Sequence, residues 1–357
     1  MEISEIGQWN LEIHNRYNPY DGIFERGDGQ FLSFKDDPRL PMIIEPIAGI
    51  DGHPRSFACM NPSECNTDIG SSRFFSLVAL ANAPDGSVFV GDSNLIRRIT
   101  PDGQIYTVYK LRTNTNRQNF EYHIAFNSID QYLYISDPER FQIIRVPIQE
   151  KYESNQEITM PEAEIVIGTG EQCFPHDRSS CDDGKTGVEV QLIYPKDLAF
   201  ANDGSLFFSD GNVIRILDTA GYVRRVVGQF TKRQWKPISC QSSHSSDHIK
   251  LKWPTSLAIH PLDGSLFFVD NHVLFKLNQN MQVSILSGYS SFCLEDSDTH
   301  KMPKNNEIDC DSPLLNAQTM SLCGDEFLFG SIAFAPDGIL YVADISRRNE
   351  NRIFAYM

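Results

Sequence analysis

An internal repeat constrains the fold of this chain of 357 residues more than any other feature of its sequence. Five segments share one pattern, in which a turn leads into a short, mostly apolar run that ends in aspartate. The five segments are Pro84–Asp92, Ser128–Asp137, Asn202–Asp210, Leu262–Asp270 and Pro336–Asp344. A turn residue lies six positions before each final aspartate; these residues are Gly86, Gln131, Gly204, Gly264 and Gly338.

Further apolar runs flank every copy of the repeat. In the third copy, the run 197–200 precedes the segment, and the runs 213–216 and 225–228 follow it. Short β-branched and aromatic runs separated by turn residues predict a four-stranded antiparallel meander. Large apolar residues occupy consecutive positions at 206–208, so both faces of the sheet are expected to be buried. Sheets buried on both faces are typical of propeller blades stacked around an axis.

The charge and the hydropathy of the chain exclude several functional classes. The net charge is −16, with 31 basic and 47 acidic residues, which argues against a nucleic-acid partner. Hydrophobic residues make up 41% of the chain, which is enough for a folded core. No apolar stretch reaches the roughly 20 residues needed to span a bilayer. The N-terminus lacks the layout of a signal peptide, so we expect no direct membrane insertion by this chain.

The cysteines favour an oxidising compartment. All eight lie in polar loops or at the edges of repeats rather than within apolar runs. An even number of cysteines in loops predicts disulfides and an extracellular location. The spacing of the cysteines does not match a zinc site. The disulfide candidates are Cys59, Cys65, Cys173, Cys181, Cys240, Cys293, Cys310 and Cys323.

The repeat resembles the NHL repeat, and the chain as a whole resembles the propeller region of teneurins, which are cell-surface adhesion proteins. The resemblance covers residues 9–357. The residues that carry it include Pro84–Asp92 with Ile96–Ile99, Gly168–Cys173 with Cys181, and Leu251–Ile259. The segment Trp9–His14 resembles the part of teneurins that precedes the propeller.

The resemblance implies an all-β fold, an NHL-type β-propeller with six blades of four antiparallel strands. About five blades are present, because the fifth copy ends at Met357 after its third strand. We therefore expect an incomplete ring and a chain that is part of a longer ectodomain. The expected domains are a segment preceding the propeller at 1–40 and the propeller at 41–357, truncated in the fifth repeat.

The repeat aspartates have a structural interpretation and a catalytic one. Asp92, Asp137, Asp210, Asp270 and Asp344 recur once per blade, whereas a catalytic site combines different residues from different blades. We therefore expect each of them to accept backbone N–H bonds in the next hairpin and to pair with a following arginine. The sequence predicts no catalytic residue, no metal ligand and no cofactor. Arg233 and Trp235 are interface candidates, because exposed Arg and Trp are favoured in protein contacts.

The first functional hypothesis is a non-enzymatic recognition module of a teneurin-like receptor that acts in contact between cells, including neurons. The resemblance implies either a second teneurin propeller or a latrophilin-like receptor as the protein partner. The alternative is a metal-dependent six-bladed propeller enzyme of the lyase or lactonase type. An intracellular RNA-binding NHL module is the third hypothesis, and the net charge of −16 opposes it.

Overall fold

The structure is a computed structural model of residues 1–357. It describes residues 72–112, 121–148, 161–174, 184–229, 243–270, 273–287 and 331–344, together with residue 48. It also describes the backbone of six short strands, at 23–25, 31–33, 67–68, 238–239, 293–294 and 352–356.

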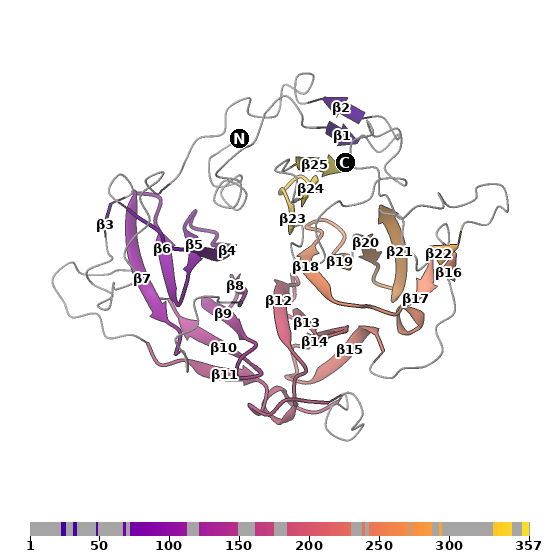
Figure 1. The fold of residues 1–357 in the computed structure, drawn as a ribbon, viewed down its shortest axis with the longest axis horizontal. Helices are drawn as coiled ribbons and strands as arrows, with labels where there is room; N and C mark the ends of the chain where they lie inside the picture. The colour runs from indigo at the N-terminus through magenta and orange to yellow at the C-terminus, as the bar shows by residue number, and fades with distance from the viewer. Residues whose placement is uncertain are drawn as a thin grey trace.

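Five β-sheets are arranged around a central axis, and the first strand of each sheet lies nearest the axis (Figure 1). The first sheet contains β4 (Leu77–Asn82), β5 (Val88–Asp92), β6 (Leu95–Ile99) and β7 (Gln104–Lys110). The second contains β8 (Ile124–Asn127), β9 (Tyr132–Asp137), β10 (Gln142–Pro147) and β11 (Glu164–Ile167). The third contains β12 (Pro195–Phe200), β13 (Leu206–Asp210), β14 (Val213–Leu217) and β15 (Val223–Gly228). The fourth contains β18 (Pro254–Ile259), β19 (Leu266–Asp270), β20 (Val273–Leu277) and β21 (Gln282–Ser287). The fifth contains β23 (Ser331–Phe334), β24 (Leu340–Asp344) and β25 (Arg352–Tyr356).

Each sheet is an antiparallel meander in which sequential strands pair with their neighbours. This confirms the predicted fold class. The second strand of each repeat is buried on both faces, as the consecutive apolar residues indicate. All five residues of β5 and all five of β19 are buried. The turn glycines and Gln131 join the first strand to the second.

Three sheets contain strands beyond the four-stranded pattern. β3 (Thr67–Asp68) pairs with β7, and β17 (His244–Ser245) pairs with β21, each antiparallel at the outer edge. In the fifth sheet, β1 (Ile23–Glu25) pairs parallel with β25 and antiparallel with β2 (Phe31–Ser33). The segment expected to precede the propeller thus adds two strands to the last sheet. A domain boundary near residue 40 stays a prediction.

A separate pair of short strands and two turns of 3₁₀ helix complete the described elements. β16 (Ile238–Ser239) pairs parallel with β22 (Cys293–Leu294) beside the fourth sheet (Figure 1). The 3₁₀ turns η4 (Gly187–Glu189) and η5 (Ser246–His248) lie in the segments that lead into the third and fourth sheets.

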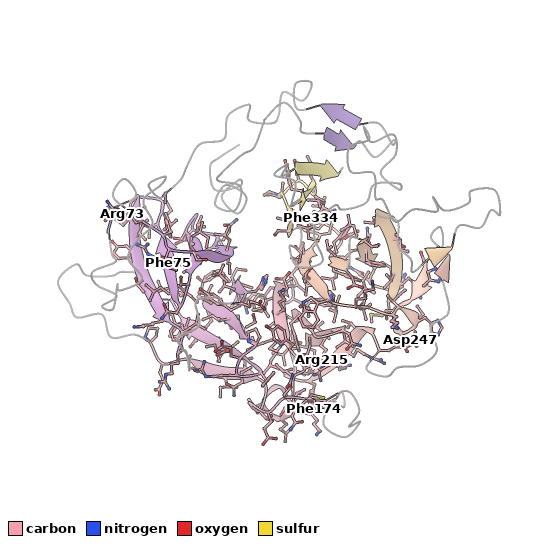
Figure 2. All side chains as sticks on the ribbon, in the orientation of Figure 1. Arg73, Phe75, Phe174, Arg215, Asp247 and Phe334 are labelled. Atoms are coloured by element: carbon pink, nitrogen blue, oxygen red, sulfur yellow. The ribbon has the colours of Figure 1, made fainter. Side chains whose placement is uncertain are left out.

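The hydrophobic core lies between successive sheets, where side chains of two neighbouring blades interdigitate (Figure 2). Phe89 of the first sheet packs in one cluster with Leu133 and Ile135 of the second. Further clusters join the second sheet to the third, the third to the fourth and the fourth to the fifth. Since each sheet needs a neighbour on both faces, the stacking around an axis follows from the burial pattern.

Three of the first strands, which lie nearest the axis, contain β-bulges. The pairing of the first strand with the second shifts register between Leu77 and Ala79, between Pro195 and Leu198, and between Thr255 and Ala258. Such β-bulges redirect side chains and are common beside functional sites. The residues inside the bulges of β12 and β18 therefore become candidates for a site near the axis.

Candidate functional site

Three repeat aspartates hold the backbone segment that leads into the first strand of their own sheet. Each carboxylate accepts hydrogen bonds from the two N–H groups that precede the first strand. The donor distances are 2.7 and 3.1 Å from Phe75 and Ser76 to Asp92, 2.7 and 2.8 Å from Ile193 and Tyr194 to Asp210, and 3.0 and 2.7 Å from Lys252 and Trp253 to Asp270. The expectation that these carboxylates bind the next hairpin was therefore wrong for these three, because the first and second strands are adjacent and antiparallel.

The second sheet follows the expected arrangement instead. Asp137 accepts a hydrogen bond from the Arg140 N–H at 3.2 Å, and the Arg140 guanidinium lies 2.7 Å from its carboxylate. Arg140 is in the hairpin that follows Asp137, so this aspartate does cap the next turn. Asp344 ends β24, but its side chain lies outside the described part of the structure.

Two buried arginines accompany the aspartates of the first and third sheets. Arg97 lies 3.8 Å from Asp92 and Arg215 lies 3.2 Å from Asp210, and each of the four side chains is at most 1% exposed. In the fourth sheet the corresponding position, two residues after the partner of the aspartate, is Phe275. Asp270 therefore lies in the core without the arginine that its two equivalents have.

Burial controls the protonation of these carboxyls. Burial raises the pKa of Asp210, while the charge of Arg215 and the N–H bonds of Tyr194 and Ile193 oppose that rise. Burial raises the pKa of Asp270 to about 6, and the N–H bonds from Lys252 and Trp253 offset it only in part. Since all of their described contacts lie within one blade, we interpret these aspartates as structural groups.

A second polar group links four blades near the axis. Asp197, inside the bulge of β12, lies 3.1 Å from His123 Nδ1 of the second sheet. Its other carboxylate oxygen accepts a hydrogen bond from the Leu257 N–H of the fourth sheet. The neighbouring Ser256 Oγ accepts a bond from the Ile332 N–H of the fifth sheet at 2.7 Å. Asp197 and Ser256 are both buried, so these bonds tie successive first strands together.

Lys196 and Tyr194 extend this group toward the end of the axis where the first strands begin. Burial lowers the pKa of the Lys196 amine, although the carboxylates of Glu121 and Asp197 act in the opposite direction. Tyr194 Oη donates a hydrogen bond to Glu121 at 2.7 Å, and its ring lies 5.2 Å from that of Trp253. These charged and polar side chains join neighbouring blades, and their charges are of the kind that could also bind a polar ligand.

The opposite ends of the first strands carry the repeat turns. Gly86, Gly204, Gly264 and Gly338 have φ between 68° and 90°, and Gln131, which replaces the glycine, has φ 63°. This is the left-handed conformation that the Asp-Gly pattern requires. The turn aspartate before each of them accepts a hydrogen bond from the N–H two residues ahead. These aspartates are Asp85, Asp130, Asp203, Asp263 and Asp337.

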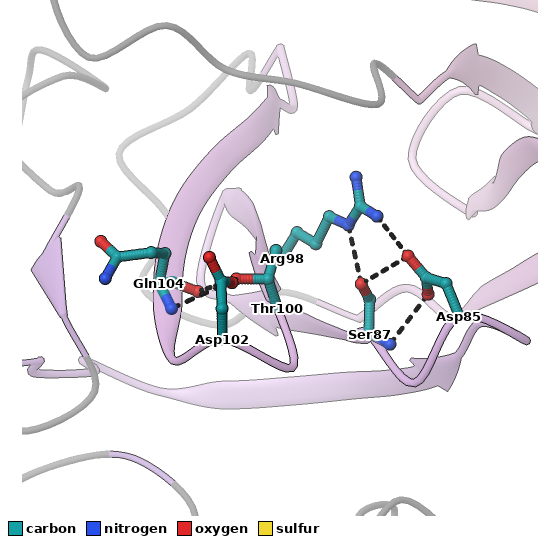
Figure 3. A network of polar contacts seen from close by, with 6 residues as sticks. All are labelled: Asp85, Ser87, Arg98, Thr100, Asp102 and Gln104. Carbon is teal, nitrogen blue, oxygen red and sulfur yellow. Dashed lines mark hydrogen bonds and ion pairs between the residues drawn. The ribbon is translucent and has the colours of Figure 1, made fainter.

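Three turn aspartates are also paired with a base on the third strand. Arg98 Nη2 lies 2.5 Å from Asp85, and its Nε donates to Ser87 Oγ (Figure 3). Arg145 lies 3.3 Å from Asp130 and Lys276 lies 3.0 Å from Asp263. Figure 3 also shows the outer turn of the same sheet, where Thr100 bonds to Asp102 and Gln104.

Most of the predicted cysteines and both interface candidates lie outside the described residues. These residues are Cys59, Cys65, Cys181, Cys240, Cys310, Cys323, Arg233 and Trp235. Cys173 is buried and is not a free thiol, and Cys293 lies in β22. The disulfide pairings and the interface role of Arg233 and Trp235 stay predictions.

Sequence reasoning missed Lys196 and Asp197 as a polar group near the axis. The only signal was two charged residues at the start of an apolar first strand, at a place where the other copies have neutral residues. Over the described ranges, His, Cys, Asp and Glu side chains form no group of three that could hold a metal ion. In the same part of the chain, no helix combines the length and the apolar character needed to span a membrane.

Comparison with known proteins shows the family of this chain. The family model of the teneurin NHL domain matches residues 41–330. Teneurin-m of Drosophila melanogaster is 39% identical over 354 residues, and Teneurin-3 of Danio rerio is 33% identical over 355 residues. Human Teneurin-1 is 31% identical over 354 residues. Each match covers 99% of this chain and 12% of the relative, so the chain spans about an eighth of their length.

Solved structures align with this chain at low sequence identity. A virginiamycin B lyase from Staphylococcus aureus aligns with a TM-score of 0.39 and 12% identity, covering 81% of this chain and 72% of that chain. A gluconolactonase from Xanthomonas campestris aligns with a TM-score of 0.42 and 12% identity, covering 78% and 74%. Likeness at this level carries no argument about fold or function.

Proposed function

This chain belongs to the teneurin family, and from that premise we propose that it is a non-enzymatic protein-recognition module of a cell-surface adhesion receptor. The observation that carries the proposal is the match to teneurins over 99% of the chain. The proposal places the module outside the cell, as one part of a longer membrane-anchored protein. In that location, the loop cysteines would form disulfides.

The geometry supports recognition by rigid display. Each sheet is fixed to the next by an apolar cluster and by bonds such as that from Leu257 N–H to Asp197. A scaffold held in this way keeps its turns and loops in one arrangement, and binding residues are commonly placed on such loops. The loss of conformational entropy on binding is then small, which favours affinity.

The proposed partner is either a second teneurin propeller or a latrophilin-like receptor on an opposing cell. Both are proteins, in agreement with the net charge of −16, which opposes binding to nucleic acid. We place no catalytic role on the His123 and Asp197 pair, because the Asp197 carboxylate joins blades by contacting the His123 side chain on one side and the Leu257 N–H on the other.

Bead aggregation tests the proposal directly. The full chain is coupled to fluorescent beads, which are mixed with beads of a second colour that carry either the same chain or a latrophilin-like receptor ectodomain. We expect mixed clusters with at least one partner and none with beads that carry albumin. If clusters form with neither partner at micromolar protein, the chain is not by itself a recognition module and the proposal fails.

A further inference from the structure

The turns between first and second strands form a continuous surface across four sheets. Ile129 of the second sheet packs against the turn of the third, with its Cδ1 3.0 Å from where a Cβ of Gly204 would stand. In the same way, Leu262 of the fourth sheet packs against the turn of the fifth, 3.5 Å from the Cβ position of Gly338. Asn202 of the third sheet donates a hydrogen bond to the Pro261 carbonyl of the fourth. We call this surface, residues 128–131, 202–204, 260–264 and 336–338, the turn strip.

Leu262 is the most exposed large apolar side chain in the described part of the chain. It is 73% exposed, and Ile129 is 63% exposed. Isolated exposed apolar residues are common and require no special explanation. The position of Leu262 is different, because the carboxylates in the turns on both sides of it, Asp203 and Asp337, differ from the other turn aspartates in their ion pairing.

The carboxylates on the two sides of Leu262 lack the base that neutralises their equivalents. Where the first, second and fourth sheets have Arg98, Arg145 and Lys276, the third has Ile216 and the fifth has Ala355. Among the described residues, neither Asp203 nor Asp337 has an ion-pair partner, and both are exposed.

The charge of Asp263, in the turn of Leu262 itself, is already compensated. Lys276 lies 3.0 Å from one oxygen of its carboxylate, and the other oxygen accepts a hydrogen bond from the Ser265 N–H. Within the part of the chain that the structure describes, the uncompensated negative charge therefore lies in the turns on the two sides of Leu262 rather than in its own turn. Leu262 is therefore an exposed apolar side chain with one carboxylate on each side, Asp203 in the third sheet and Asp337 in the fifth.

We propose that the turn strip binds a protein segment that places an apolar side chain against Leu262 and basic side chains beside Asp203 and Asp337. The inference rests on the proposed recognition function and names the chemistry of one partner. Charge complementarity selects a basic segment, because opposite potentials steer association and like charges oppose it. The same argument disfavours a second copy of this chain, whose net charge is −16.

Two synthetic peptides provide the probes, acetyl-Arg-Leu-Trp-Arg-amide and acetyl-Glu-Leu-Trp-Glu-amide. They are titrated into the full chain, labelled at its leucine methyl groups, and the methyl signal of Leu262 is assigned by its loss in Leu262→Ser. We expect the basic peptide to shift this signal and the acidic peptide to leave it unchanged. We also expect the effect of the basic peptide to weaken at high salt.

Variants separate the contribution of each group. Leu262→Ser should weaken binding of the basic peptide about tenfold or more, since it removes one buried leucine contact. Asp203→Asn and Asp337→Asn should each weaken it about threefold while keeping the oxygen that caps the turn. Two controls outside the turn strip, Val188→Ser and Asp85→Asn, should change it less than twofold, because Val188 is an exposed apolar side chain on another element and Asp85 is already paired with Arg98.

The proposal is overturned if the two peptides bind equally, if neither shifts Leu262, or if the controls weaken binding as much as Leu262→Ser. It is also overturned if the methyl signal of Leu262 broadens as the protein concentration rises without peptide, because that would assign the surface to contact with a second copy of this chain. The bead assay distinguishes the two proposals. If partner-dependent clusters persist with Leu262→Ser, the turn-strip proposal is rejected and the recognition proposal stands. If the wild-type chain forms no clusters, the recognition proposal is rejected. In that case, the peptide titration still decides the turn-strip proposal.

Discussion

Asp270 offers a direct test of how this propeller tolerates buried charge. Its side chain is 1% exposed and accepts hydrogen bonds from the N–H groups of Lys252 and Trp253. Phe275 stands where Arg215 compensates the equivalent carboxyl in the third sheet. The perturbation is Asp270→Asn, which removes the charge and keeps an oxygen that can accept the same bonds.

The size and the sign of the effect follow from linkage. The pKa of Asp270 is about 6 in the folded chain against 3.8 as the ordinary value. Because the folded pKa is the higher one, the folded state binds the proton more tightly, and stability is lost as the pH rises from about 4 to about 6. At 1.36 kcal/mol per pKa unit, the loss is about 3 kcal/mol. Asparagine does not titrate, so Asp270→Asn should not show this loss.

The assay is urea unfolding of the wild-type chain and of Asp270→Asn between pH 4 and pH 7.5. We expect the stability of the variant relative to the wild type to rise by about 3 kcal/mol over that range. The matched control is Asp210→Asn, which leaves Arg215 buried without its carboxylate and should destabilise the chain at neutral pH. A difference between Asp270→Asn and the wild type that stays flat or falls as the pH rises would refute the reasoning.

Three further predictions concern the other structural groups. Arg215→Met should cost about 3–5 kcal/mol in urea unfolding because it leaves Asp210 buried without a cation, and a cost below 1 kcal/mol would contradict the role of the pair. Gly168→Ala should lower the midpoint of thermal unfolding of the chain more than Gly221→Ala does. Both glycines have positive φ, but only at Gly168 would a Cβ overlap the backbone preceding β10. Equal midpoints for the two variants would contradict this. Reduction of the disulfide predicted at Cys173 should lower stability by about 2 kcal/mol, measured as the loss of the free energy of unfolding in dithiothreitol, and no change would count against that disulfide.

Much of the fold follows from patterns in neighbouring residues. The Asp-Gly turns, the apolar runs and the spacing of the aspartates predict the meander and the burial of both faces. Gln131 shows the strength of the pattern, because it adopts the left-handed conformation of the glycines it replaces. The role of the aspartates could be predicted only in part. Their bonding direction depends on how the first strand approaches the second, which the spacing alone does not specify.

The axis group illustrates the opposite case. His123 and Asp197 are 74 residues apart, and Leu257 is 60 residues further along, yet hydrogen bonds and short contacts join the three. No local pattern predicts such contacts, since they depend on the rotation of one blade relative to the next. The pairing of β1 with β25 was likewise invisible in the sequence, because it joins segments from the two ends of the chain.

The sequence by itself determined the repeat, the number of its copies, the all-β class and the places where turns occur. These properties depend on residues close along the chain, through turn chemistry and through short apolar runs whose consecutive large residues bury both faces of a sheet. The tertiary structure decided which carboxylates are compensated and which backbone groups they hold. It also decided that Leu262 lies between two turns whose carboxylates have no ion-pair partner in the described ranges. Those properties depend on distances between blades, and the packing of side chains across the blade interfaces sets these distances.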